Sequence, residues 1–401
     1  MKKRFLLIMM VFTLVFMTTS CTSSKINNEI TNKITNEVVK YEDITITDFE
    51  NAVEKTAEKV EHSIVGIAIK AISTTGSSAI SEDYAVFGSG IIYKAVQNLD
   101  NGIVTGFTYY VVTNRHLIVN EEIEKAKVYI FLGYEDVEIE ATIVGYDTKV
   151  DIACLTFVHT KFIQPAEFGD SDAIKKGSFI LAVGNPDGFD YYGSVTMGIV
   201  SSPLRYLASD TDDDGVQDFY GQYIQHDAAI NAGNSGGGLF TIDGKLVGMN
   251  TLKIVGSDVE SMCFAIPSNE MKTILDNYLE KGLPIIRPRL GISSYAVREL
   301  TPAVIEAQKL QSIPDIYEPN ERQYGLYVSE ITEGGSIADT AIKTGDIILT
   351  FDGEKIKTFA GFSAQINSLD NYQVGDVVEV TYYSRASGSI ETISLTLKTS
   401  R

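Results

Sequence analysis

Residues 233–237 read Gly-Asn-Ser-Gly-Gly, a glycine-rich turn around one serine, Ser235. Glycines beside a serine allow the backbone to turn tightly, expose the hydroxyl and direct N–H groups at an oxygen that becomes negative during acyl transfer. Such a serine acts as a nucleophile when a neighbouring base takes up its proton. The same five residues also occur in ordinary glycine-rich loops of β-proteins. The positions of the histidines therefore decide whether this serine is a candidate nucleophile.

All four histidines of the chain precede Ser235: His62, His116, His159 and His226. The Gly-x-Ser-x-Gly pattern is also typical of the α/β-hydrolases, but that fold needs its histidine after the serine. The chain order therefore excludes an α/β-hydrolase. It leaves the order His…Asp…Ser, which is that of the trypsin-like proteases.

His116 and Asp151 are the candidates for the base and for the group that orients it. His116 ends the run Val-Val-Thr-Asn-Arg-His, and Asp151 stands directly before the apolar run Ile-Ala-Cys-Leu. A carboxylate at the mouth of a strand can be shielded from water and fix the tautomer of an imidazole. Asp147, in the polar turn before Asp151, is the weaker candidate. His226 lies close to Ser235 in sequence and is a candidate for a structural hydrogen bond near the site.

The elements that must position these residues are mostly strands. From Ile64 to Ile266 the chain consists of short β-rich runs separated by Gly, Asn and Asp, which predicts antiparallel β-structure long enough for two barrels, with a break near 165–176. Helices are expected over 47–61 and 269–281. From Arg287 on, strand-like runs and two helices, near 336–341 and 359–369, predict a separate small mixed β/α domain.

Several segments, in this order, resemble the HtrA (DegP-like) family of serine proteases: GSGIIY, VVTNRH, VDIACL, AVGNPDG, GSVTMGIVSS, DAAINAGNSGG, LVGMNT and FAIPSN. The resemblance implies a mainly β fold, with two antiparallel β-barrels of the chymotrypsin type followed by a small α+β PDZ domain. It implies a catalytic triad of His116, Asp151 and Ser235, with the backbone N–H groups of Gly233 and Ser235 as the oxyanion hole. Two positions depart from the family pattern, because Ala232 and Gly238 stand where the family usually has proline.

The same resemblance implies an ATP-independent endopeptidase that degrades unfolded or damaged extracytoplasmic proteins and assembles as a homotrimer. The chemistry of such an enzyme requires no cofactor and no metal. The alternative function is a catalytically silent chaperone or peptide-binding scaffold, against which the intact triad and the Ser235 turn weigh.

The C-terminal region resembles a PDZ domain. The residues that correspond to its carboxylate-binding loop are Arg289, Leu290, Gly291 and Ile292. Such a domain binds the C-terminus of a peptide as an added strand of its sheet. The insertion between Arg298 and Arg322 is longer than usual, and we expect it to obstruct or reshape that groove.

The N-terminus has the pattern of a signal peptide: Lys2, Lys3 and Arg4 precede an uncharged apolar run that ends at Met17. Small residues leading into Cys21 resemble a bacterial lipobox, which implies a lipid anchor on the extracytoplasmic face of the cell membrane. An uncleaved anchor or plain secretion is the alternative, because Thr18 stands where the lipobox prefers leucine. The expected organisation is a signal peptide (1–20), a lipid-anchored polar tether (21–46), the protease domain (47–284) and the PDZ domain (287–401).

The composition limits the kinds of partner and of site that the chain can have. With 53 acidic against 33 basic residues in 401, the net charge is −20, which argues against nucleic acid as a partner. Three cysteines form no disulfide framework, and we expect Cys154 and Cys263 to lie in the core. The stretch Asp210–Asp218 copies the first nine positions of a calcium loop, but Gly221 stands at position 12, so a solvated acidic turn is the favoured interpretation. This stretch lies within a second unusual insertion (208–219), and a first one spans 95–107.

Overall fold

The computed structural model describes residues 45–399, apart from 74–80, 120–125, 134, 136, 187–190, 212–216, 218, 252–261 and 319–322. The chain divides into two units, residues 1–51 and 52–401, and the β-structure belongs to the second. The predicted signal peptide, Cys21 and nearly all of the predicted tether lie outside the described residues, as does most of the acidic stretch 210–218. No helix within the described ranges is long and apolar enough to cross a membrane.

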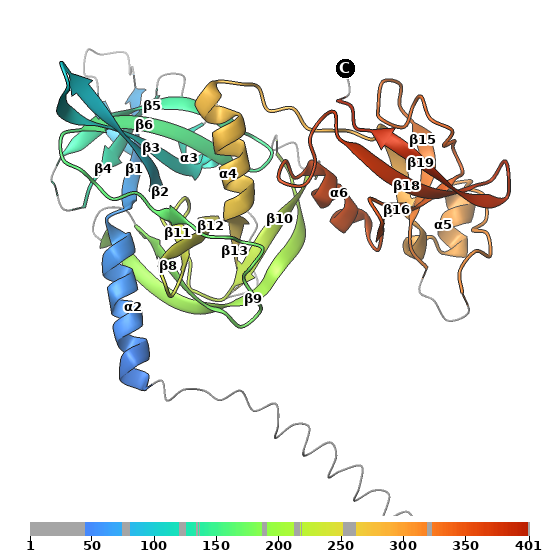
Figure 1. Cartoon of the computed structure of the whole chain (residues 1–401), viewed down its shortest axis with the longest axis horizontal. Coiled ribbons are helices and arrows are strands. Elements are labelled where there is room, and N and C mark those ends of the chain that lie inside the picture. Colours follow the sequence, from blue (N-terminus) through green and yellow to red (C-terminus); the bar gives the residue numbers. More distant parts are fainter. Residues whose placement is uncertain are drawn as a thin grey trace, which may run out of the picture. The chain divides into compact units, whose positions relative to one another are not determined.

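The first strands form a closed barrel in the order β1-β2-β3-β6-β5-β4 (Figure 1). Neighbours pair antiparallel, and alternate side chains fill the interior with large apolar groups such as Ile67, Tyr109 and Leu155. The strands are β1 (Ile64–Ser73), β2 (Ser81–Asp100), β3 (Ile103–Asn114), β4 (Ala126–Phe131), β5 (Glu138–Asp147) and β6 (Ile152–His159).

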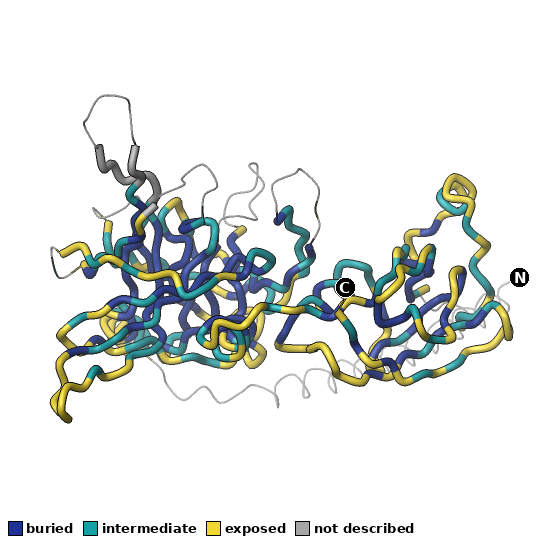
Figure 2. Tube along the Cα trace, turned by 90° about the horizontal axis from the view of Figure 1, so that it is seen from above, coloured by how far each residue is buried: buried dark blue, intermediate teal, exposed yellow. Residues whose placement is uncertain are grey.

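The next seven strands form a second sheet in the order β11-β8-β9-β10-β13-β12-β7. An additional pairing of β11 with β12 joins six of them into a ring, so the second expected barrel is present. The strands are β7 (Glu167–Phe168), β8 (Phe179–Gly184), β9 (Ser194–Ser209), β10 (Phe219–His226), β11 (Gly238–Thr241), β12 (Lys245–Thr251) and β13 (Cys263–Pro267). In Figure 2 buried chain, drawn dark blue, is concentrated inside the left-hand part, which contains these strands.

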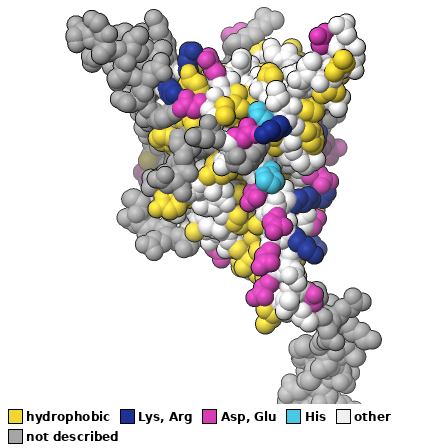
Figure 3. Space-filling view, turned by 90° about the vertical axis from the view of Figure 1, so that its left-hand side faces the viewer, with side chains coloured by type: hydrophobic (Ala, Val, Ile, Leu, Met, Phe, Trp, Pro, Cys, Tyr) yellow, Lys and Arg dark blue, Asp and Glu magenta, His cyan; other side chains and the backbone are white. Residues whose placement is uncertain are grey.

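Helices surround this β-structure. The predicted N-terminal helix is α2 (Ile46–Glu61), which buries Thr56 and Val60 and carries acidic and basic side chains on its exposed side (Figure 3). A four-residue helix, α3 (Arg115–Ile118), follows β3. The helix expected over 269–281 is α4 (Ser268–Asn277) and a 3₁₀ turn, η2 (Leu279–Lys281), closed by a left-handed Gly282. Apolar residues of α4 join a core that includes residues of both barrels.

The C-terminal region has its own sheet, in the order β14-β15-β16-β18-β19, with β17 paired to β16. Its strands are β14 (Ile292–Ala296), β15 (Leu326–Ile331), β16 (Ile347–Phe351), β17 (Glu354–Lys355), β18 (Val377–Ser384) and β19 (Ser389–Thr396). Its helices are η3 (Val297–Glu299), α5 (Pro302–Ala307) and α6 (Phe359–Asn367). The strand β14 lies at one edge of this sheet.

The helix predicted near 336–341 is wrong. Those residues form turns, because the N–H groups of Ser336 and Ile337 donate to the carbonyls of Arg289 and Leu290, and the next turns close with three-residue spacing. The first N–H groups of this segment therefore bind the chain that leads into the edge strand β14, and they do not form helical hydrogen bonds.

Residues 298–318 of the long insertion pack on one face of the C-terminal sheet, and α6 packs on the other. Alternate residues of a strand point to opposite faces. Leu326 joins the core of α6 with Phe362, while Tyr327 joins a second core with Val304 and Ile305 of the insertion. The described part of the insertion thus contributes its apolar residues to the face away from α6.

Candidate active site

Asp151 and His116 are brought together at the edge of the first barrel. The Asp151 carboxylate accepts from the backbone N–H of His116 at 2.9 Å and lies 2.7 Å from its Nδ1. The Asp151 carbonyl accepts from Arg115 N and from Asn114 Nδ2, both at 3.1 Å. Asp151 therefore fixes the whole 114–116 segment as well as the imidazole, and the side chain of His116 keeps 29% of its surface exposed against 10% for Asp151.

Asp151 itself adopts a left-handed backbone, with φ of 64°. This conformation is uncommon for a residue with a side chain and persists where the surroundings hold it in place. Asp147, the weaker sequence candidate, does not contact the histidine. Its carboxylate binds the guanidinium of Arg287, and it also accepts from Lys149 N at 3.0 Å.

The turn that carries Ser235 packs directly against the first barrel. The Ser235 carbonyl accepts from Ser89 N on β2 at 2.9 Å. A methyl group added to Gly236 would overlap the Ser89 carbonyl and come within 2.5 Å of Thr113 Oγ1. Since Thr113 is three residues before His116, the predicted nucleophile and the predicted base lie on neighbouring segments.

Asn250, on β12, holds the turn from the other side. Its carbonyl accepts from Gly236 N at 3.0 Å, its own N–H donates to Gly237 O at 2.8 Å, and its amide donates to Gly238 O at 3.1 Å. The turn is therefore fixed between the two barrels. Gly237 and Gly238 stay close to their neighbours because they lack side chains.

The two N–H groups predicted to form an oxyanion hole are those of Gly233 and Ser235. Gly233 has a φ of 95°, which favours glycine, and Asn234 N between them donates to Asn231 O at 3.0 Å. Within the described residues neither Gly233 N nor Ser235 N has a hydrogen-bond acceptor. Both donors are thus available to an oxygen of a substrate.

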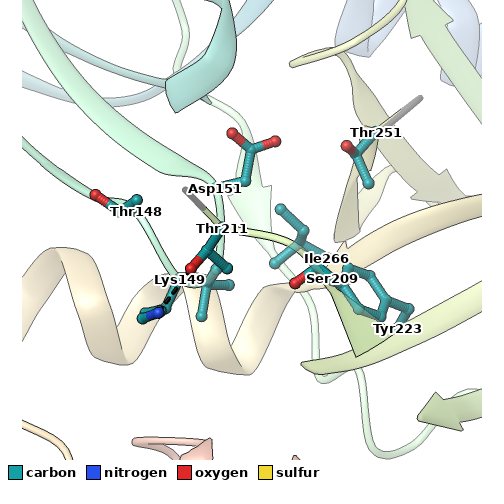
Figure 4. Close-up of a pocket in the computed structure, with 9 residues that line it drawn as sticks. Thr148, Lys149, Asp151, Ser209, Thr211, Tyr223, Thr251 and Ile266 are labelled. Atoms are coloured by element: carbon teal, nitrogen blue, oxygen red, sulfur yellow. Dashed lines mark hydrogen bonds between the residues drawn. The ribbon is translucent and has the colours of Figure 1, made fainter. Parts of the chain in front are cut away.

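A cavity of about 10 Å³ lies beside Asp151, between the two barrels (Figure 4). In Figure 4 the Asp151 carboxylate points away from Lys149, whose amine donates to Thr211 Oγ1 at 2.6 Å. Burial raises the pKa of Tyr223 at the wall of the cavity, and the negative charges of Asp151 and Asp147 raise it further. Tyr223 therefore stays neutral beside the catalytic candidate. The cavity is large enough for about one water molecule and too small for a substrate side chain.

His226 is fully buried at the end of β10, opposite Cys263 on β13. Neither ring nitrogen makes a hydrogen bond of normal geometry to a described residue. Burial lowers the pKa of His226 to about 4, a fall that the Asp227 charge, the Ala228 backbone and Asn250 partly oppose. The ring is therefore neutral under ordinary conditions.

The cysteines and the remaining histidines lie away from the triad candidates. Cys154 and Cys263 are buried free thiols, as expected, and burial raises the pKa of Cys154 to about 12. His159 ends β6 and lies 3.1 Å from Glu135. His62 follows α2 at the surface. Among the described residues, no group of three or more His, Cys, Asp and Glu side chains could hold a metal ion.

The predicted carboxylate-binding loop, Arg289–Ile292, leads into the edge strand β14. Arg289 N donates to Lys398 O at 2.8 Å, and the Leu290 and Arg289 carbonyls accept from the 336–337 segment. Gly291 has a φ of 72° and packs against Gly335. In the described part of the chain, the N–H groups of Leu290 and Gly291 have no acceptor.

Two residues that support the segments of the site, Ser89 and Arg287, are absent from the sequence-based candidates. Ser89 lies in the GSGIIY segment, where the sequence offers no chemical reason to single out a serine between two glycines. Arg287 lies 140 positions from its partner Asp147 and follows no local pattern. Only the three-dimensional contacts identify them.

Comparison with known proteins gives two domain matches. Residues 88–249 match a family described as a trypsin-like peptidase domain, and residues 288–397 match a PDZ domain. The chain is 35% identical over 303 residues to a serine protease Do-like HtrA of Lactobacillus helveticus, covering 73% of this chain and 64% of that protein. It is 34% identical to the HtrA of Bacillus subtilis, covering 80% and 68%, and 31% identical to the HtrB of that organism, covering 90% and 74%.

Among solved structures, an HtrA-type protease, AlgW, with a decapeptide has the same fold, with a TM-score of 0.59 and 24% identity. The likeness covers 88% of this chain and 98% of that one. The expected fold class is therefore confirmed. The two domain matches come in the expected order, and the chain covers more than two thirds of the two Bacillus subtilis relatives. This chain therefore belongs to the HtrA family of serine proteases, with a trypsin-like peptidase domain followed by a PDZ domain.

Proposed function

We propose that the chain hydrolyses peptide bonds with Ser235 as nucleophile, His116 as general base and acid, and Asp151 as the group that orients the imidazole. The observation that carries this proposal is the double contact of Asp151 with the ring and the backbone of His116, beside the Ser235 turn. A carboxylate on Nδ1 fixes the tautomer in which Nε2 is free to accept a proton.

The proposed reaction proceeds through an acyl-enzyme. Ser235 Oγ attacks the scissile carbonyl and passes its proton to His116 Nε2, which then gives it to the leaving amine. The positive charge on the imidazole is stabilised by Asp151. The carbonyl oxygen, negative in the tetrahedral intermediate, accepts from Gly233 N and Ser235 N, which have no other acceptor among the described residues.

The proposed substrates are unfolded or damaged extracytoplasmic proteins. A relative, 32% identical over 297 residues, is a periplasmic serine endoprotease, DegP, of Salmonella typhimurium, which supports an extracytoplasmic role. A site between two barrels suits an extended chain, because a folded protein has few free segments that could enter such a site. The chemistry proposed here requires no ATP, cofactor or metal.

The PDZ domain is proposed to bind the free C-terminus of a peptide at Arg289–Ile292. The strand β14 is an edge strand, and the relative with a bound decapeptide has the same fold. A peptide that adds a strand to β14 would place its terminal carboxylate near the N–H groups of Leu290 and Gly291. The exposed side chain of Arg289 adds a positive charge at this position.

Contacts between the two domains support regulation of the protease by the PDZ domain. Glu270 of α4 accepts from Ser368 Oγ and, at 3.2 Å, from Leu369 N, just beyond α6. Leu369 is buried in the core that includes α4. Burial raises the pKa of Glu270, and Ser368 and the Arg287 guanidinium oppose that rise.

Two further proposals rest on the sequence alone. Cys21 is proposed to carry a lipid that anchors the chain to the extracytoplasmic face of a bacterial membrane, after removal of residues 1–20. The assembly is proposed to be a homotrimer, as the family resemblance implies.

The proposed activity is tested with casein as an unfolded substrate. Wild-type protein should cleave casein, and Ser235→Ala should abolish cleavage, because triad residues act as a unit. Cleavage near the wild-type rate in Ser235→Ala would remove Ser235 as the nucleophile. A wild-type protein that binds casein without cleaving it would favour the silent chaperone or scaffold.

A further inference from the structure

We propose that Ser89, on β2 of the first barrel, is a positioning residue for the oxyanion hole in the second barrel. Its hydroxyl fixes the peptide group that lies between the two proposed donors, Gly233 N and Ser235 N. This inference rests on the catalytic assignment proposed above and adds to it a residue that has no part in proton transfer.

Ser89 contacts the carbonyl groups on both sides of Asn234. Its Oγ donates to Gly233 O at 2.7 Å, and its backbone N–H donates to Ser235 O at 2.9 Å. The carbonyl of Ser89 in turn accepts from Thr113 Oγ1 at 2.7 Å. One residue of the first barrel thus fixes two carbonyls of the nucleophile turn, those on either side of Asn234, and Thr113 on β3 fixes that residue.

The direction of the Ser89 hydroxyl is determined by its other neighbours. Asn185 donates to Ser89 Oγ twice, from its backbone N at 2.8 Å and from Nδ2 at 3.2 Å. A hydroxyl has one proton to give, and both Asn185 groups are donors, so the proton points to Gly233 O. The Asn185 amide is oriented as well, because Nδ2 donates to Val65 O at 2.9 Å and Oδ1 accepts from Gly193 N at 2.9 Å.

The Ser89 side of this contact is buried, since Ser89 has 0% of its surface exposed, whereas Gly233 is half-buried. Breaking the contact would leave the buried Ser89 hydroxyl without an acceptor, at a cost of about 1–3 kcal/mol. The conformation that keeps this bond is therefore strongly favoured over one that breaks it.

The peptide group between Gly233 and Asn234 controls both donors of the proposed hole. Its carbonyl is held by Ser89 Oγ, and its N–H donates to Asn231 O at 3.0 Å. Gly233 has no side chain and tolerates other backbone angles at little cost. Without Ser89 Oγ, rotation about this glycine would turn Gly233 N away from the position of the oxyanion. The hydroxyl thus maintains a preorganised pair of donors before substrate arrives.

A positioning role predicts a specific kinetic pattern. The oxyanion forms only after the attack, so Ser89→Ala should lower kcat with a peptide substrate by about 10- to 100-fold, less than the loss of a whole donor. KM should change by less than about 3-fold, because the hydroxyl does not touch the substrate. The affinity for a peptide boronic acid, whose tetrahedral adduct puts an oxygen in the hole, should fall by the same factor as kcat.

The matched control is Ser63→Ala. Ser63 is also a buried serine, in the turn directly before β1, and its Oγ donates to a backbone carbonyl, Val60 O, at 2.6 Å. This variant should lose similar thermal stability and keep kcat and boronate affinity within about 2-fold, since it does not contact the turn. Ser89→Cys keeps the shape with a weaker donor and should give a kcat between those of Ser89→Ala and the wild type.

The experiment uses the full chain and measures kcat, KM, boronate affinity and the melting temperature for the wild type and for each variant. A Ser89→Ala protein with wild-type kcat and boronate affinity would overturn the inference, as would equal losses in Ser63→Ala. If Ser89→Ala does not fold, a folded Ser89→Cys with wild-type kcat and boronate affinity overturns it. Ser235→Ala is run in parallel, because an active Ser235→Ala protein would contradict the proposed nucleophile and not the role of Ser89.

Discussion

Arg287 and Asp147 form a buried ion pair in which both terminal nitrogens of the guanidinium bind the carboxylate, with Nη1 3.1 Å from Oδ1. Their side chains are 11% and 4% exposed. Arg287 Nε also donates to Asn367 O at the end of α6, at 2.8 Å. Asp147 begins the turn that ends at Asp151. The pair therefore joins the PDZ domain to the segment that positions the candidate catalytic carboxylate.

This contact predicts that Arg287 transmits the state of the PDZ domain to the triad. Arg287→Gln would leave Asp147 buried without its cation, at about 3–5 kcal/mol of unfolding free energy. We expect basal cleavage of a peptide substrate to fall and the response to a PDZ-binding peptide to be lost, because the two domains no longer share the pair. The measurement is the cleavage rate with and without peptide.

Lys272→Gln is the control for Arg287→Gln. Lys272 pairs with Asp276 on the surface of α4, where such a pair contributes about 0–1 kcal/mol. This variant should keep the wild-type rate and the wild-type response to peptide. A full peptide response in a folded Arg287→Gln protein would contradict the coupling.

The carboxylate-binding loop is tested by charge reversal. Arg289→Glu puts a negative charge beside the N–H groups of Leu290 and Gly291, and should weaken binding of a peptide with a free C-terminus by at least about 10-fold. Lys309→Glu, an exposed change in the insertion, should leave the affinity unchanged. Fluorescence anisotropy with a labelled peptide gives both affinities. Equal affinity for the wild type and Arg289→Glu, or for free and amidated peptides, would argue against this loop as the site.

The buried His226 predicts a change of stability in mild acid. Its pKa is about 4 in the folded chain against an ordinary value near 6.5, so the unfolded state takes up the proton first as the pH falls. Stability should be complete above about pH 6.5 and decrease down to about pH 4, by roughly 3 kcal/mol from this residue. When unfolding by denaturant is measured across that pH range, the free energy of unfolding should fall less steeply with decreasing pH in His226→Gln than in the wild type. The exposed His62→Gln is the control and should keep the wild-type slope.

Gly236 predicts a large effect of one methyl group at the nucleophile turn. Gly236→Ala would push a Cβ into the Ser89 carbonyl and strain a residue with φ of 83°, so casein cleavage should fall at least about 100-fold. Gly102→Ala, with the same φ and open space around it, carries the strain without the overlap and should keep wild-type activity. Similar activities of the two variants would mean that the turn does not depend on this close packing.

Much of the fold is predictable from the sequence because its strands are short, apolar and separated by turn residues. The runs before His116 and after Asp151 became β3 and β6, which are neighbours in the barrel. Chain order and strand position were the grounds on which His116 and Asp151 were predicted. In the structure the Asp151 carboxylate contacts His116, whereas the Asp147 carboxylate binds Arg287.

The rest of the fold and of the candidate site depends on contacts between segments that are far apart in the sequence, and no local pattern encodes them. The segment 336–341 has helix-forming residues, but its N–H groups bind the 289–290 segment. His226 seemed suited to a hydrogen bond, yet the interior of the second barrel offers its ring no partner of normal geometry among the described residues. Ser89 lies 144 positions before Gly233, and only barrel docking brings them together.

Covalent labelling of the full chain with a fluorophosphonate probe tests the catalytic assignment most directly. Such a probe reacts with a serine only when a base activates it and an oxyanion hole receives its oxygen. The assignment predicts one modified peptide, which contains Ser235, no labelling in Ser235→Ala, and wild-type labelling in Gly102→Ala. Labelling of a different residue, or labelling that persists in Ser235→Ala, would contradict it.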